Sequence, residues 1–572
     1  MPGPLNSAAV TDAERRAHDR HRLPVVLAVL AVLALHVYLL TPAASFLGIP
    51  SAKDLIALSG VSSGKILTET GLFAPAVTLV APESSSRAEY LATLYLAAIG
   101  AFLSVYFLRL EYKLPALLAW SIAAILALYG VAATAGLLLA HVVVHLTLHP
   151  RRKGLPLLGA LPGVLATLAF SRTAPASFAG IGGMALAAAA SVLIYRYVVL
   201  PLLAKPRVAG PLRTIVVQSA LIAVCVAALI EGRTGAEWTI PLGLLLFFWQ
   251  WARLMLYHVD YKDGLVPEDT SFPRYLVVFL SPGAIPAWTW SVEIGQGYSY
   301  TANNFLCENK NKTVLAGVRI LLVSLLYLSL WSWGSDLLAR MFGAAGVDVF
   351  GGKLETMIDA FVSGGVDVGA ASVLATTLVH LAMWTMAWAG IAHLKVGLWR
   401  ICGFRCEPYF DRPWMATNLV ALWTRFTFHY REFLVRAFYF PVFFGFFRKR
   451  PYLRIVAATM AAAAVGNMIW GHLTEEMFYQ GTLYENFFAV FRTWPYYVLL
   501  GGGISITELY LMKTRHRRRK PWTPGPRIVL DVLAAYATIQ FYAMIHIFWS
   551  ATDDSTVWDL FRLFARGLGV HL

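Results

Sequence analysis

Long apolar runs recur along this sequence from residue 24 to near its C-terminus. Such runs, each of about 20 residues, match the hydrocarbon thickness of a bilayer, and they predict roughly 11–14 membrane segments. Lipid offers the backbone no hydrogen-bond partners, and the runs do not alternate as barrel strands do, so each segment is expected to be a helix. The predicted fold is therefore all-α, a polytopic transmembrane helical bundle.

The charged residues support this interpretation. Only 14% of the 572 residues are charged, whereas a soluble domain carries about 25%. The formal net charge of +15 comes from short basic clusters between apolar runs, at residues 15–22, 151–153, 205–213, 448–454 and 513–520. The positive-inside rule places these clusters in the cytoplasm, together with the N-terminus, which we interpret as part of a retained signal anchor. The clusters therefore indicate topology, and no nucleic-acid partner is expected.

Composition changes along the chain suggest four parts. Residues 1–23 form a basic cytoplasmic N-terminus, and 24–235 form an apolar transmembrane scaffold rich in alanine and glycine. Residues 236–505, which contain more polar and aromatic side chains, are the predicted catalytic core, and 506–572 supply a cytoplasmic loop and the last membrane helix. Proline-rich interruptions in the core favour re-entrant or interfacial helices, which membranes tolerate where protein or water satisfies the backbone.

Two groups of metal-ligating residue types receive a structural interpretation. Three histidines, His141, His145 and His149, share one helix face but run into a basic cluster, so we expect an interfacial, solvated face. The sequence also has four scattered cysteines, too few for a disulfide framework, and Cys402 and Cys406 have no matching histidine pair. No metal site is predicted.

His472 is the strongest candidate for chemistry. It follows an apolar, alanine-rich run and precedes Glu475 and Glu476. An ionisable group at membrane depth is costly unless it faces a cavity or a partner, so it marks a functional site by default. A neutral imidazole there could take a proton from a hydroxyl as general base. The alternative is a buried histidine bonded to a helix carbonyl, and Glu475 could either orient the ring or mark the helix end.

Four ordered segments resemble the membrane-bound O-acyltransferase family, especially its bacterial members that acylate cell-envelope polymers. The first two segments comprise residues 240–243 (IPLG), 247–250 (FFWQ), 257–264 (YHVDYKDG), 272–276 (FPRYL) and 281–286 (SPGAIP). The third comprises 410–414 (FDRPW), Asn418, Trp423, 425–426 (RF) and 439–441 (YFP), and the fourth is 470–472 (WGH). Each piece alone is weak, but their order across roughly residues 240–500 is fairly specific.

The resemblance implies roles for the polar residues of these segments. His472 corresponds to the membrane-embedded general base, and the second polar catalytic position falls on Thr427, with His429 two residues further on. Asn418, Thr427 and His429 are candidates for orienting groups or oxyanion donors. On a continuous helix a two-residue offset is about 200°, so we expect Thr427 to line the cavity and His429 to face phosphate or headgroups.

The segment from 410 to 447 is predicted to form re-entrant or interfacial helices at the donor entrance. Its arginines could pair with coenzyme A phosphates, although snorkelling arginines of an interfacial helix would give the same composition. The candidate substrate-binding residues are Trp423, Arg425, Arg431, Arg436, Trp470 and Glu475.

The sequence thus predicts an O-acyltransferase of the inner (cytoplasmic) membrane. An acyl thioester such as acyl-CoA would be a donor substrate, not a permanent cofactor, and the acceptor would be a hydroxyl of an envelope glycan or a lipid. Membrane lipid is an expected partner, and an extracytoplasmic protein is a candidate partner. Two alternatives remain open, a transporter or flippase of an envelope lipid and a catalytically inactive relative that acts as a subunit.

Overall fold

The computed structural model describes residues 22–40, 87–108, 112–124, 126, 138, 141, 145, 256–257, 259–260, 263–267, 270–280, 297–304, 310–468, 493–514, 521–522 and 525–571. Most of these residues are helical, and none of them lies in a strand, as the all-α prediction requires. Among them, three helices are long and apolar enough to cross a membrane: Asn311–Trp331, Ala370–Ile401 and Ile528–Trp549. The larger number of membrane segments stays a prediction.

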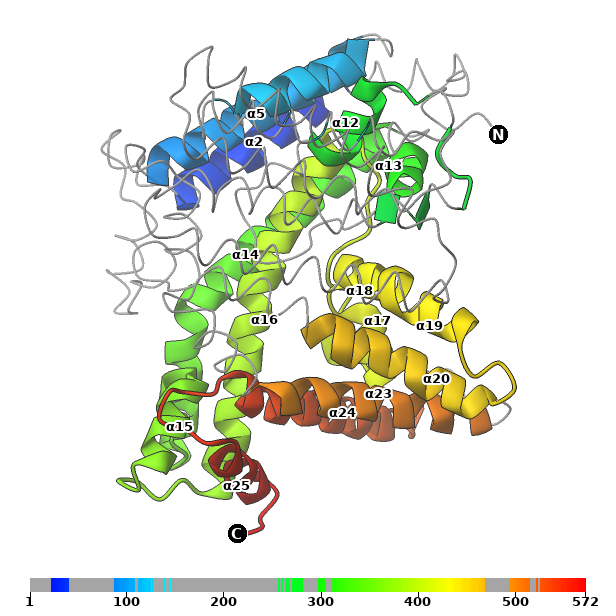
Figure 1. Ribbon diagram of the computed structural model, residues 1–572. Coiled ribbons are helices and arrows are strands. Elements are labelled where there is room, and N and C mark those ends of the chain that lie inside the picture. The colour runs from blue at the N-terminus through cyan, green and yellow to red at the C-terminus, as the bar shows by residue number, and fades with distance from the viewer. Residues whose placement is uncertain are drawn as a thin grey trace, which may run out of the picture. The chain divides into compact units, whose positions relative to one another are not determined.

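The chain divides into two compact units, one built mainly from residues before 325 with 391–408, the other mainly from 326–390 and 409–572. In the first unit, α2 (Arg22–Leu40) and α5 (Arg87–Phe107) pack side by side, as Figure 1 shows. Both coincide with apolar runs of the sequence. The buried His36 ties this pair to α14 (Lys310–Ala344), because its ring contacts both the Tyr95 hydroxyl, at 3.2 Å, and the Leu321 carbonyl, at 3.0 Å.

The first unit also contains α12 (Phe272–Leu280) and α13 (Tyr298–Asn304). His141 is fully buried, and its Nδ1 lies 3.0 Å from the Tyr275 hydroxyl of α12. The expectation of a solvated histidine face is therefore wrong for His141. The error came from the basic cluster that follows it, since the sequence does not reveal that tyrosine and phenylalanine rings cover the imidazole.

In the second unit, the C-terminal half of α14 packs against α16 (Ala370–Ile401). Close approach requires a glycine here, because a Cβ added to Gly390 would lie 2.6 Å from the Leu328 side chain. The remaining helices are α15 (Leu354–Val362), α17 (Leu419–Arg425), α18 (Phe428–Leu434), α19 (Phe440–Gly445), α20 (Pro451–Thr459), α23 (Trp494–Lys513), α24 (Ile528–Trp549) and α25 (Val557–Gly567).

Two π-helical segments lie within longer helices of this unit. The first, η6 (Val435–Tyr439), joins α18 to α19, and the second, η7 (Met460–Gly466), extends α20. The two segments pack against each other, with Gly466 so close to Phe438 that an added Cβ would lie 2.7 Å from its ring. Single π turns inside α-helices are uncommon and often occur at functional sites.

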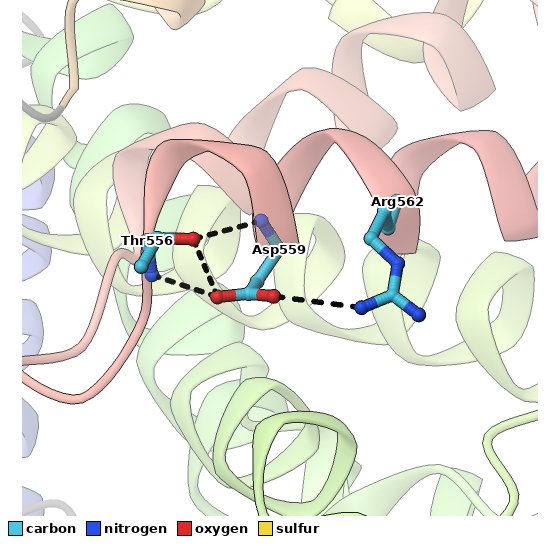
Figure 2. A network of polar contacts seen from close by, with 3 residues as sticks. All are labelled: Thr556, Asp559 and Arg562. Atoms are coloured by element: carbon cyan, nitrogen blue, oxygen red, sulfur yellow. Dashed lines mark hydrogen bonds and ion pairs between the residues drawn. The ribbon is translucent and has the colours of Figure 1, made fainter. Parts of the chain in front are cut away.

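The amphipathic helix α25 begins with a reciprocal cap. The Thr556 hydroxyl accepts a hydrogen bond from the Asp559 backbone N–H at 3.2 Å, while the Asp559 carboxylate accepts one from the Thr556 N–H at 3.1 Å. Figure 2 shows this network and the Arg562 guanidinium, 3.8 Å from the same carboxylate. A capping box of this kind satisfies backbone donors that the first helical turn leaves unpaired. Arg566 then joins α25 to Asp367 at 2.6 Å.

Candidate functional site

The segment that resembles the acyltransferase motif folds around a turn between α17 and α18. Two backbone hydrogen bonds secure it, from Asp411 N–H to the Arg425 carbonyl at 2.9 Å and from Phe428 N–H to the Tyr409 carbonyl at 2.8 Å. Thr427, between the two helices, has a positive φ of 51°. This left-handed conformation costs a non-glycine residue about 1–2 kcal/mol, so the surrounding structure must hold it.

Asn418 begins the same motif as a helix cap. Its backbone is extended, and its side-chain Oδ1 accepts a 2.8 Å hydrogen bond from the backbone N–H of Ala421, in the first turn of α17. Asparagine is among the preferred residues at this position, because its oxygen satisfies a donor with no partner inside the helix. The structure thus gives Asn418 a structural role, and its role as an orienting group stays a prediction.

His429 lies elsewhere than the sequence predicted. One continuous helix was expected to turn His429 away from Thr427 toward headgroups, but α17 ends at Arg425 and α18 starts at Phe428. The left-handed Thr427 between them resets the helical phase, so the 200° argument does not apply. The His429 side chain is fully buried, with its ring centroid 5.9 Å from that of Tyr409 and 5.1 Å from that of Phe428. This burial contradicts the expectation that His429 faces lipid headgroups, whereas a role toward phosphate stays a prediction.

The predicted phosphate-binding arginines have partners within the chain. Arg431 forms an ion pair with Glu432, and its guanidinium also lies 5.7 Å from the Phe428 ring centroid. Arg425 donates a 3.4 Å hydrogen bond to the Arg412 carbonyl. Because Glu432 offsets the charge of Arg431, this arginine is a weaker candidate for phosphate than the sequence suggested.

Arg436 and Trp423 are both partly buried. Arg436 lies in η6, and Trp423 lies in α17. The helices of this motif are short, and none of those from 410 to 447 is among the candidate membrane spans. Their predicted re-entrant or interfacial placement stays a prediction.

A buried polar contact links this motif to the helix that leads toward His472. The Tyr430 hydroxyl donates a 2.6 Å hydrogen bond to the side-chain Oδ1 of Asn467, which is 6% exposed. Asn467 directly follows η7, and this described stretch ends one residue later, at Met468. Trp470, His472 and Glu475 lie outside the described residues.

The cysteines considered as metal ligands are buried thiols. Burial raises the pKa of the Cys406 thiol to about 12, although the nearby Arg400 guanidinium lowers it in part. Burial also raises the pKa of the Cys402 thiol. Arg400 also donates a 2.8 Å hydrogen bond from Nε to the Cys406 carbonyl. In the described part of the chain, no group of three or more His, Cys, Asp or Glu side chains is placed to hold a metal ion.

A second histidine cluster was missed from the sequence. The His546 ring on α24 lies within ring-contact distance of His380 and Trp384 on α16, and of Tyr496 on α23. His380 and His546 lie inside candidate membrane spans. An ionisable residue in an apolar run marks a candidate functional site, which is the argument that selected His472. The same argument, applied evenly along the sequence, could have found them.

Comparison with known proteins does not extend this description. No protein-family model matches the sequence, and a search of the curated proteins finds no match.

Proposed function

We propose that this chain is an integral membrane O-acyltransferase that moves an acyl group, such as acetyl, from a cytoplasmic thioester to a hydroxyl of an envelope glycan or lipid. The observation that carries the proposal is the order of four motif segments between residues 240 and 500, resembling the membrane-bound O-acyltransferases. We place the protein in the inner membrane as a multi-pass protein, a proposal supported by the three apolar helices of spanning length.

The geometry of the matched motif is compatible with this function. The motif between residues 409 and 428 is closed by backbone hydrogen bonds, and it presents a left-handed turn at Thr427 beside the buried His429. Strained backbone positions of this kind cluster at active sites, where the surrounding structure holds them. The Tyr430 to Asn467 hydrogen bond then connects this motif with the helix that precedes the proposed base.

The proposed reaction is a direct transfer. The His472 imidazole takes the proton of the acceptor hydroxyl as its oxygen attacks the thioester carbonyl, forming the new C–O bond. The C–S bond breaks as the tetrahedral intermediate collapses, and the imidazolium returns the proton to the leaving thiolate. The products are an ester and a free thiol, with no covalent enzyme intermediate. Asn418, Thr427 and His429 are the candidates for stabilising the oxyanion or orienting the acceptor.

The first test is acyl transfer by the full chain in lipid nanodiscs, with radiolabelled acetyl-CoA and membrane lipid or glycan acceptors. His472→Ala should lose about 10²- to 10⁴-fold in rate, as expected for removal of a positioned base. His571→Ala is the matched control, because His571 is an exposed histidine near the C-terminus. Activity of His472→Ala close to that of the control would assign the base elsewhere. Lipid translocation without acyl transfer would favour a flippase.

A second test separates the two residues near the turn. Thr427→Val removes the hydroxyl and keeps the β-branched shape, whereas His429→Gln keeps a hydrogen-bonding group of similar size in the buried site. A fall in kcat with unchanged KM for one variant would give that residue the transition-state role. Equal, small effects of both variants would contradict a catalytic role for either.

A further inference from the structure

The His546 imidazole is a buried polar group whose hydrogen-bonding capacity is unused within the described chain. Its side chain is 2% exposed, and neither Nδ1 nor Nε2 has a hydrogen-bond partner among the described residues. A neutral imidazole offers one donor and one acceptor, and leaving both unpaired in a buried site is unfavourable. An additional partner is therefore expected at His546.

Aromatic rings surround His546, and we call this group of rings the frame; two of the rings are tyrosines, which carry hydroxyl groups. The Tyr542 and Tyr496 rings lie edge-on to the imidazole, with centroids 4.9 and 5.4 Å away, and their hydroxyls are 3.2 Å apart. The Trp384 ring is edge-on at 5.3 Å, and the His380 ring lies at 6.0 Å. These residues come from three helices, of which α23 and α24 run side by side in Figure 1.

Polar contacts continue along two of these helices, α16 and α24. Gln540, on α24, donates from Nε2 to the Leu374 carbonyl at 3.2 Å and contacts the Thr377 hydroxyl at 3.1 Å, both on α16. Thr377 also precedes His380 by three residues, so it lies on nearly the same helix face. The α16–α24 contact therefore carries amide, hydroxyl and imidazole groups where two apolar spans would otherwise pack with apolar side chains.

The chemistry of the frame selects an uncharged ligand. The rings that contact His546 in the described part of the chain are phenols, indoles and a second imidazole. The Glu355 carboxylate interacts electrostatically with His380, but it is not among the described groups that act on His546. Because no described charged side chain acts on His546 itself, an ion would be poorly stabilised at its buried ring. A hydroxyl group suits either ring nitrogen, because it can accept a hydrogen bond from the protonated nitrogen or donate one to the unprotonated nitrogen.

We propose that His546, with Tyr496 and Tyr542, forms a buried binding site for a small uncharged hydroxyl compound, either water or an alcohol. The site is separate from the motif that suggests acyl transfer, and it does not require that activity. Phe426 is its link to that motif, since this ring stacks on Trp384 at 5.7 Å and contacts Tyr542 at 5.2 Å.

Histidine-selective ¹⁵N NMR of the full chain in nanodiscs tests the proposal. The His546 signals are identified by their loss in His546→Gln, or in His546→Phe if the first variant does not fold. We expect an acceptor nitrogen with the shift of a hydrogen-bonded imidazole, and Tyr542→Phe should move that shift because it changes the polar frame. Tyr536→Phe, an exposed tyrosine on the same helix, is the matched control.

Two arms distinguish the sources of the hydroxyl. Magnetisation transfer from water protons to the His546 ring would identify water, whereas a shift produced by added 1-propanol, without transfer from water, would identify an alcohol site. Nitrogen shifts typical of an imidazole without hydrogen bonds, with neither response, would overturn the proposal and show that the ring packs only against aromatic faces. Because no acyl transfer is measured, this result is independent of the test of His472.

Discussion

The Tyr430 hydroxyl donates a 2.6 Å hydrogen bond to the Asn467 side chain, joining α18 to the helix that leads toward His472. Because Asn467 is buried, Tyr430→Phe would leave its side-chain oxygen without this donor, at a cost of about 1–3 kcal/mol. We therefore expect a lower thermal unfolding midpoint for Tyr430→Phe in detergent micelles. Tyr510→Phe, an exposed tyrosine on α23, should leave the midpoint nearly unchanged. Equal midpoints for the two variants would contradict the structural importance of this contact.

Gly466 should tolerate no side chain. An alanine Cβ at this position would lie 2.7 Å from the Phe438 ring, so Gly466→Ala should destabilise the protein by about 1–3 kcal/mol through overpacking. Gly502→Ala is the control, because that helical glycine has open space around it, and alanine should stabilise it by about 0.5–1 kcal/mol. Adding Phe438→Leu to Gly466→Ala should recover part of the loss. Failure of this recovery would show that the two segments do not pack as described.

Cys402 and Cys406 should react slowly with maleimide in the folded protein. With a pKa of about 12 for Cys406, only ~10⁻⁴ of its thiol is ionised at pH 8, and the thiolate is the reactive form. Labelling is best followed in a Cys225→Ser/Cys307→Ser background by intact mass, where both thiols should react only after denaturation in SDS. Asp553→Cys in the same background provides an exposed thiol that should label quickly. Rapid labelling of the native thiols would contradict their burial.

The cap of α25 should control the stability of that helix locally. Thr556→Ala removes the side-chain oxygen that accepts from the Asp559 N–H, which typically costs about 0.5–2 kcal/mol. Amide hydrogen exchange of peptides covering residues 557–567 should therefore become faster. Thr556→Ser keeps the hydroxyl and should exchange like the native protein. Unchanged exchange in Thr556→Ala would show that tertiary contacts such as Arg566 to Asp367 hold the helix without its cap.

Apolar length was the most informative sequence signal for the fold. It predicted the all-helical class, and α2 and α5 lie in such apolar runs, because a run long enough to span hydrocarbon restricts the backbone to one regular structure. Local irregularities were not predictable in the same way. The residue type of Thr427 does not predict its positive φ, because threonine disfavours this conformation. The conformation depends instead on the hydrogen bonds that hold the turn.

At the candidate site, too, the sequence predicted which residues matter but not the contacts that they make. The sequence selected Asn418 as a polar residue of a motif, but its capping hydrogen bond to Ala421 depends on where α17 begins. Arg431 was selected for its charge, while its pairing with the adjacent Glu432 depends on side-chain conformation. His546 could have been selected as a histidine in an apolar run, but its neighbours could not, because His380 and Tyr496 lie on distant segments and only the folded chain brings the rings together.

The wide turn of η7 has a consequence for how this part of the chain can vary. Residues 461–464 are four consecutive alanines, and each residue advances an α-helix by about 100° and the wider π turn by somewhat less. Exchanging one of them for another small residue would keep Asn467 pointing at Tyr430, whereas deleting one would rotate Asn467 by about a quarter of a circle and break their contact. What this stretch must preserve is the number of its residues more than their identity, so insertions and deletions should be far less tolerated here than substitutions.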